Sequence, residues 1–207
     1  MADDQQRIRN LPQDRWTPEV EALFPIMVPP TSKAKGSDFN SILVLAQHPR
    51  LSEHWLRFNA AASRGFVLPA RLKEIAVLRI AWRSQSDYEW VQHMLAGLRE
   101  GLTPDDFAAL QSELVDERWG ETDRAVIHAA DGLWRYQNVD EETWFALSAH
   151  FTIEQIMELL YVVGAYIALA CILNVGEVQL EPAMAAQAEA LGLPKLAWNP
   201  ATEDRGQ

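Results

Sequence analysis

The sequence predicts an all-α protein, and three observations lead to this fold class. From Phe39 onward the signals typical of helices continue almost without interruption. No run of alternating apolar and polar residues is long enough to predict a strand. Residue patterns that begin helices precede several of the segments. We therefore expect helices over residues 39–46, 50–64, 69–83, 87–101, 104–115, 121–136, 141–149, 153–174 and 182–191.

Specific residues justify the helix boundaries. Pro69 and Pro104 suit the first turn of a helix, where a backbone N–H has no partner within the helix, and Gly101 ends the helix before Pro104. Ser86–Glu89 and Thr152–Gln155 fit the capping box, in which two side chains satisfy free backbone donors. We expect both patterns to begin helices.

The segment Tyr161–Leu173 is apolar all round. A helix that is apolar on every face is a buried one, so this segment predicts the central helix, with a subunit contact as a further role. The apolar run alone is too short to span a bilayer.

The composition favours one globular domain with ends of different character. The chain has 207 residues, of which 48% are hydrophobic and 23% charged. Residues 1–38 form a proline-rich arm that also carries bulky apolar side chains, so we expect it to pack on another surface. We assign residues 39–192 to the helical domain and residues 193–207 to a tail.

Charge and cysteine content exclude several classes of function. The net charge of −11 and the pI of about 4.9 disfavour nucleic acid and membrane surfaces as partners. The N-terminus lacks the pattern of a secretory signal peptide, so we expect a cytoplasmic protein. Cys171 is a single cysteine and predicts neither an intrachain disulfide nor a thiolate metal site. No histidine spacing predicts a metal, and we expect no cofactor.

The segment Leu68–His93 resembles the superfamily of carboxymuconolactone decarboxylases and alkylhydroperoxidase D. Alkylhydroperoxidase D-like members carry a Glu, a Cys-x-x-Cys pair, and a His four residues after the second Cys. Here Glu74 and His93 occupy the Glu and His positions, whereas Ser86 and Glu89 occupy the cysteine positions. The cysteine-free decarboxylase branch is the closer match.

This resemblance covers roughly residues 40–181 and carries several implications. It implies an alkylhydroperoxidase D-like helical bundle that assembles as a homo-oligomer, with a trimer or hexamer favoured. It also implies that His93, Glu74 and Glu89 are catalytic. The partner would be a small-molecule substrate, as in the breakdown of aromatic compounds.

The residue pattern around Glu74 is consistent with a proton carrier. Glu74 shares a helical stripe with core residues such as Leu78, so we expect its carboxylate to be partly desolvated and its pKa to be raised. The alternative is an ordinary salt bridge, for instance with Arg71 or Arg79.

His93 lies one turn before two small residues, Ala96 and Gly97, which leave room for a ligand. Histidine titrates near neutral pH, and Glu89 four residues earlier could hold and orient it. A structural role in the core is the alternative for His93, and capping the helix is the alternative for Glu89.

The substrate-binding residues are predicted by residue type. Aromatic side chains could line a pocket for a cyclic or aromatic-derived substrate, although aromatics at helical spacing are usually core. An arginine could anchor a substrate carboxylate. The predicted set is Ser86, Tyr88, Trp90, Arg79, Arg83 and Tyr166.

Three functions remain open. The leading hypothesis is a cofactor-independent lyase of the decarboxylase type, or an isomerase, acting on a small carboxylated lactone or aromatic-derived compound. A non-catalytic or ligand-binding member of the fold is the alternative. An alkylhydroperoxidase-like reductase is disfavoured because Cys171 has no partner thiol. Motifs for phosphoryl transfer, serine hydrolysis and hydride transfer are absent from the sequence.

Overall fold

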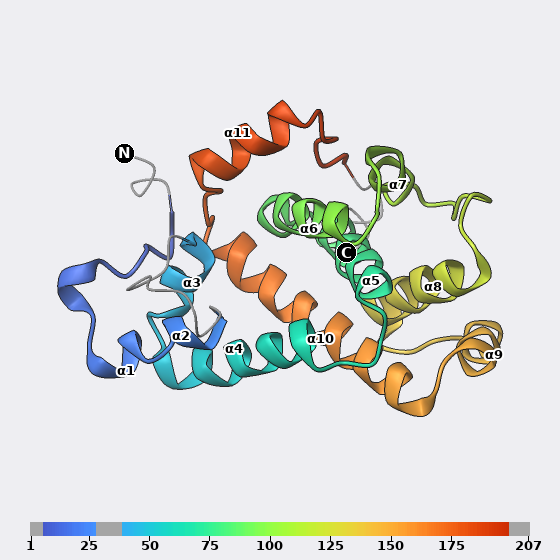
Figure 1. The fold of residues 1–207 in the computed structure, drawn as a ribbon, viewed down its shortest axis with the longest axis horizontal. Helices are drawn as coiled ribbons and strands as arrows, with labels where there is room; N and C mark the ends of the chain where they lie inside the picture. The colour runs from blue at the N-terminus through green and yellow to red at the C-terminus, as the bar shows by residue number, and fades with distance from the viewer. Residues whose placement is uncertain (1–5, 28–38, 199–207) are drawn as a thin grey trace. The chain divides into compact units, whose positions relative to one another are not determined.

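The computed structural model describes residues 6–27 and 39–198, and it divides the chain into two compact units. The first unit comprises residues 1–66 and 173–181, and the second comprises residues 67–172 and 182–207. Figure 1 labels the helices, which account for the regular structure of the described residues. The all-α prediction is confirmed.

The described residues of the first unit form four helices and a short 3-10 turn at Gln13–Arg15. The helices are α1 (Pro18–Glu21), α2 (Phe24–Met27), α3 (Asn40–Leu45) and α4 (Pro49–Arg64). The described part of the predicted arm, residues 6–27, contributes to the core of this unit. That core contains Leu11, Val20, Leu23, Phe24, Ala46 and Leu56. Residues 28–38 of the predicted arm lie outside the described residues.

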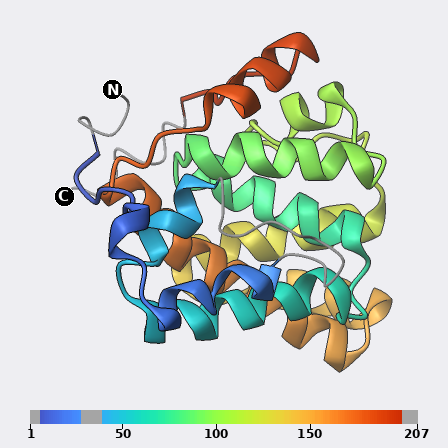
Figure 2. The same ribbon diagram turned by 60° about the vertical axis from the view of Figure 1, so that its left-hand side comes forward.

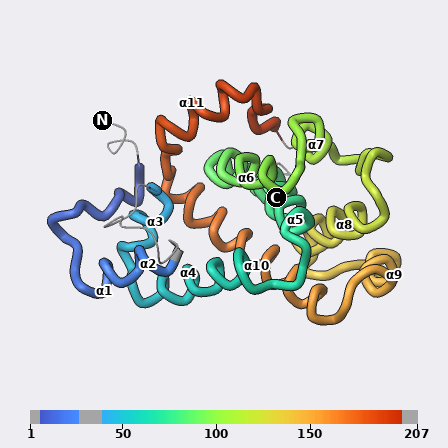
Figure 3. The backbone as a smooth tube through the Cα atoms, viewed as in Figure 1, coloured from blue at the N-terminus to red at the C-terminus, as the bar shows by residue number. Residues whose placement is uncertain are grey.

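The second unit contains the remaining helices of the described residues. They are α5 (Ala70–Arg83), α6 (Asp87–Arg99), α7 (Pro104–Ala109), α8 (Glu121–Tyr136), α9 (Glu141–His150), α10 (Ile153–Val175, whose last residues belong to the first unit) and α11 (Pro182–Ala190). Helix α5 packs against both α6 and α8, as Figures 1 and 2 show. The tube in Figure 3 shows α9 beside α8. Helix α5 is buried along most of its length, and side chains on it are therefore shielded from water.

One predicted capping box is confirmed and the other is wrong. The Thr152 N–H donates to Gln155 Oε1 at 3.0 Å, and the Gln155 N–H donates to Thr152 Oγ1 at 3.3 Å. Ser86 precedes α6 as predicted, but its side chain makes no capping hydrogen bond. Helix α6 therefore begins without the box, and Glu89 is left for another role.

Helix α7 ends at Ala109, six residues earlier than predicted. The guanidinium of Arg79 donates to the carbonyl oxygens of Leu110 and Ser112 at 2.7 and 2.6 Å. In a continued helix these carbonyls would accept bonds from later N–H groups. Arg79 replaces those partners, so the chain leaves the helix there.

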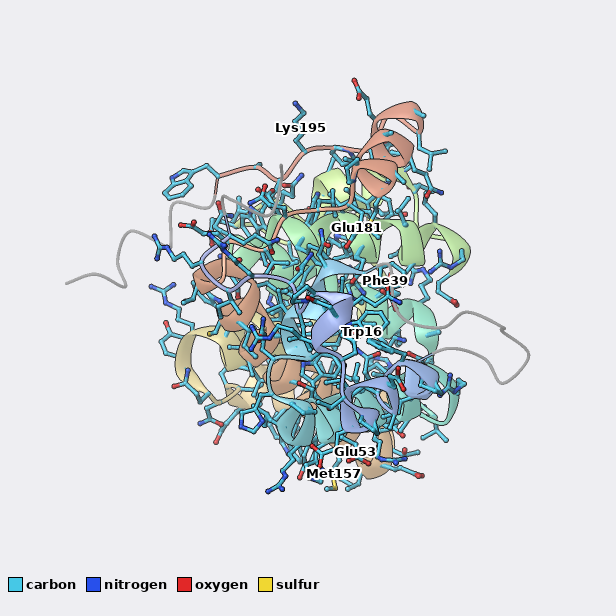
Figure 4. The ribbon with its side chains drawn as sticks, turned by 90° about the vertical axis from the view of Figure 1, so that its left-hand side faces the viewer. Trp16, Phe39, Glu53, Met157, Glu181 and Lys195 are labelled. Atoms are coloured by element: carbon cyan, nitrogen blue, oxygen red, sulfur yellow. The ribbon has the colours of Figure 1, made fainter. Side chains whose placement is uncertain are left out.

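Helix α10 is buried on one face only, so the prediction of burial on every face is wrong. Met157, Tyr161, Gly164, Ala168 and Cys171 lie on its exposed face, and Figure 4 shows the Met157 side chain pointing away from the ribbon. The helix has 23 residues, long and apolar enough to cross a membrane by length and composition, unlike the shorter run considered above. A single helix that passes this test is weak evidence of a membrane span, because core helices pass it too.

The described part of the predicted tail packs on the second unit. Trp90 Nε1 donates to the carbonyl of Pro194 at 2.9 Å. Gln111 Nε2 donates to the carbonyl of Lys195 at 3.2 Å, whose side chain points outward in Figure 4. Residues 199–207 lie outside the described residues.

Candidate functional site

The packing of α5 against α6 brings together Glu74 and His93, which are 19 residues apart in the sequence. His93 Nδ1 lies 2.6 Å from Glu74 Oε2. The side chains are only 13% and 5% exposed, respectively. The two residues that occupy the family frame thus form one buried acid–base pair.

Glu74 is ionised in this pair, contrary to the expectation of a raised pKa. Burial is the largest single influence and raises the pKa of Glu74. The charge and hydrogen bond of His93, added to those of Lys73, outweigh burial, so the pKa of Glu74 is lowered. Lys73 Nζ lies 3.2 Å from the second carboxylate oxygen. The alternative of a salt bridge is therefore confirmed, but with Lys73 as the partner. The arginines named for it are wrong, because Arg71 is paired with Asp123 and Arg79 with Asp131.

The ionised carboxylate fixes the tautomer of His93. A carboxylate only accepts hydrogen bonds, so Nδ1 carries the hydrogen that it donates to Glu74. Nε2 is then the ring nitrogen that can take up or release a proton. In this arrangement Glu74 holds the His93 ring in one orientation through Nδ1.

The predicted aromatic residues differ in their positions. The Tyr166 ring, from α10, meets the His93 ring edge-on with centroids 4.9 Å apart. Trp90 is fully buried and holds the carbonyl of Pro194. Tyr88 is buried at the start of α6. The structure therefore brings Tyr166 to the acid–base pair, whereas Trp90 supports the C-terminal segment.

Ser86 and Glu89 are buried at the start of α6 without hydrogen-bond partners. Neither carboxyl oxygen of Glu89 nor Ser86 Oγ has one among the described residues. Burial raises the pKa of Glu89 to about 8, against a smaller opposing effect of the nearby Ser86 hydroxyl. Glu89 is consequently a neutral carboxylic acid at neutral pH.

Arg79 and Arg83 belong to a separate ionic cluster, so the structure does not place them as anchors beside His93. Both guanidiniums form two hydrogen bonds with Asp131 of α8. Arg83 also binds both oxygens of Glu113 at 2.6 and 2.7 Å. The two guanidiniums lie over the ring of Trp82, each 4.5 Å from its centroid. This arrangement accounts for their charge and burial in structural terms.

Sequence reasoning missed Lys73, which forms an ion pair with Glu74, and Asp131, which forms ion pairs with Arg79 and Arg83. The four-residue spacing of Arg79 and Arg83 on α5 gave a signal for a shared acidic partner, but nothing in the sequence pointed to Asp131. A cavity of about 500 Å³ opens beside this cluster, lined in part by Arg83, His128 and Asp140. The part of the chain that the structure describes has no group of three residues able to hold a metal ion.

The fold and the buried pair define a helical protein with a carboxylate–imidazole site and no cysteine pair. Residues 49–132 match the family model described as the carboxymuconolactone decarboxylase family. The match includes Glu74, Glu89 and His93. It confirms the family that the sequence resembles.

A solved structure supports the fold. It is a protein of unknown function from Agrobacterium tumefaciens, named as a candidate antioxidant defence protein of the AhpD type. Its TM-score to this chain is 0.61 at 16% sequence identity, covering 65% of this chain and 93% of that chain. At this identity the similarity shows the fold alone. No curated protein matches the chain.

Proposed function

We propose that this protein is a cofactor-independent acid–base enzyme, a decarboxylase-like lyase or an isomerase, that acts on a small carboxylated lactone. The observation that carries the proposal is the 2.6 Å contact between His93 Nδ1 and Glu74 Oε2 in a buried position. The family match of residues 49–132 agrees with this class of reaction.

The chemistry follows from the properties of the pair. In decarboxylation the bond between the substrate carbon and its carboxylate breaks, carbon dioxide leaves, and the electron pair remains on the substrate. A conjugated lactone holds this pair on its carbonyl oxygen until a proton arrives at carbon. His93 Nε2 is placed to deliver that proton, and Glu74 stabilises the protonated imidazole.

The same pair serves an isomerase. In that reaction His93 removes a proton from one carbon and returns it to another, and no group leaves. Cytoplasmic localisation, expected from the N-terminal sequence, is part of the proposal. A role in the breakdown of aromatic compounds, expected from the family resemblance, is also part of it.

The reductase alternative requires two thiols at the site. Ser86 and Glu89 occupy the positions of the family's cysteine pair and cannot form a disulfide. Cys171 is exposed on α10, outside the buried pair. Under the non-catalytic alternative, the wild-type protein has no turnover, and replacing His93 changes only the binding of a ligand.

The test is turnover of carboxymuconolactone, followed by ultraviolet absorbance and by release of carbon dioxide. Loss of absorbance with carbon dioxide release identifies the lyase, and a spectral change without it identifies the isomerase. His93→Ala is the control. If the wild-type protein shows neither a spectral change nor carbon dioxide release beyond that of His93→Ala, the proposed reaction is wrong.

A further inference from the structure

Three buried polar atoms at the start of α6 have no hydrogen-bond partner among the described residues: Ser86 Oγ and the two carboxyl oxygens of Glu89. Glu89 is 1% exposed and Ser86 is completely buried. Most buried polar atoms in proteins have a partner, and leaving one unpaired costs free energy. Two such residues three positions apart indicate a place where a bound molecule supplies the missing hydrogen bonds.

No charged group holds Glu89 in its ionised form. Besides Glu89 itself, the titratable and charged groups on α5, α6, α10 and α11 are Arg71, Lys73, Glu74, Arg79, Arg83, Asp87, Tyr88, His93, Arg99, Glu154, Glu158, Tyr161, Tyr166, Cys171 and Glu189. The pKa of Glu89 is set instead by burial, with an opposing effect of the Ser86 hydroxyl. Glu89 can therefore donate a hydrogen bond at neutral pH, which an ionised carboxylate cannot do.

Glu89 lies one helical turn before His93. Side chains four residues apart on a helix are neighbours on one face. The same α6 face therefore carries a neutral acid at Glu89 and the proton carrier His93, which is bonded to Glu74.

We propose that the neutral Glu89 carboxyl, with the Ser86 hydroxyl beside it, donates a hydrogen bond to the carbonyl oxygen of a conjugated lactone substrate. This proposal rests on the function proposed above and assigns a role within it. As carbon dioxide leaves, negative charge develops on the carbonyl oxygen, and a neutral acid stabilises that charge where a carboxylate would repel it. Ser86 and Glu89 keep their protons while His93 protonates the substrate carbon.

Infrared spectroscopy tests the proposal without turnover. At about pH 7 the wild-type protein should show a carbonyl band of a neutral carboxylic acid that Glu89→Gln lacks. Asp87→Asn is the matched control, because partial burial also raises the pKa of Asp87 on the same turn. This control should retain the Glu89 band. Absence of a Glu89-dependent band would overturn the proposal.

The ligand arm uses γ-crotonolactone, a small conjugated lactone, as the probe. Its addition should shift the Glu89 band to lower frequency in the wild-type protein and in Asp87→Asn. A band that does not move at saturating probe would show that Glu89 does not contact a lactone carbonyl, and would also overturn the proposal.

Activity separates a donor from a merely buried side chain. Glu89→Gln keeps an N–H donor and should retain more of the turnover of carboxymuconolactone than Glu89→Leu, which should lose about a hundredfold. Full activity of Glu89→Leu contradicts the role. Absence of turnover in the wild-type protein counts against the proposed reaction, whereas the band shift still decides whether Glu89 binds a lactone.

Discussion

His93 Nδ1 lies 2.6 Å from Glu74 Oε2 across the contact between α6 and α5. His93, and to a lesser extent Lys73 at the other carboxylate oxygen, keeps the Glu74 carboxylate charged although it is buried. A charged, fixed acceptor makes the orientation of the imidazole specific. This relationship supports the proposed acid–base role of His93.

We expect Glu74→Gln to lower turnover of carboxymuconolactone by about a hundredfold or more, with little change in melting temperature. The amide oxygen can still accept the hydrogen bond from Nδ1, but it no longer stabilises a positive imidazole. His93→Ala should cause a loss of activity at least as large. Turnover rates and thermal melts of the purified variants provide the measurement.

Asp123→Asn is the matched control for Glu74→Gln. Asp123 is a buried carboxylate of α8 that holds Arg71, also of α5, at 2.7 and 3.1 Å. Its replacement should lower the melting temperature and leave turnover unchanged. If Glu74→Gln behaves in the same way, the Glu74–His93 pair is structural.

We expect Asp131→Asn to destabilise the fold by roughly 3–5 kcal/mol at neutral pH, because it leaves buried Arg79 and Arg83 without their shared carboxylate. Burial raises the pKa of Asp131, but its bonds to Arg83 and Arg79 outweigh burial and lower it. The stabilisation is therefore present above the pKa of an unfolded aspartate and lost as pH falls through the lower folded value. Urea unfolding at neutral and acid pH measures the free energy of unfolding of both proteins. A difference between wild type and Asp131→Asn that is as large in strong acid as at neutral pH would contradict the prediction.

The sequence predicted the long helices because their signals are local. Pro69, Pro104 and Thr152 mark helix starts through bonds within one turn, and these helices begin within a residue of the expected positions. The early end of α7 was not predictable, because Arg79 causes it from a distant part of the chain. The short helices α1 and α2 lie in a proline-rich region without clear periodicity.

The candidate site was predicted only in part, for the same reason. The pairing of Glu74 with His93 followed from the family frame, but the charge of Glu74 depends on where His93 and Lys73 lie in three dimensions. Ser86 and Glu89 have the spacing of a capping box, and only the structure shows that the box is not made.

We expect Glu89→Gln to remove a pH dependence of stability between weakly acid and weakly alkaline solution. Because burial raises the folded pKa of Glu89 to about 8, folding favours its protonated form. Its contribution is complete below the unfolded pKa and is lost as pH rises through about 8, by at most roughly 5 kcal/mol. Denaturant unfolding across this range should give a flatter curve for Glu89→Gln. Parallel curves for both proteins would show that Glu89 is solvated.

We expect no dithiol-dependent peroxidase activity. The reaction needs a thiolate and a resolving thiol, and the only cysteine is Cys171. Peroxide consumption in the presence of a dithiol should equal that of Cys171→Ala and of buffer. Robust turnover of an organic hydroperoxide that Cys171→Ala abolishes would contradict the assignment.

The exposed face of α10 predicts that copies of this chain assemble through it. Met157, Tyr161, Gly164, Ala168 and Cys171 are exposed and alternate at spacings of four and three residues, the pattern with which two helices pack along a seam. The small residues at the middle of this face permit close approach, and Tyr161, 65% exposed, provides apolar area. A second copy offers the same face, which a symmetric contact requires.

We expect light scattering to give a mass that is a multiple of 23.4 kDa for the wild-type protein. Ala168→Glu places a charge in the seam and should reduce the assembly toward the monomer. Ala186→Glu adds the same charge at an exposed position of α11 and should not change the mass. Helix α10 is also long and apolar enough, by length and composition, to cross a membrane. Flotation of the same variants with neutral lipid vesicles is therefore measured as well. A wild-type mass of 23.4 kDa at every concentration, or vesicle binding that Ala168→Glu abolishes, would show that this face does not bind a second copy.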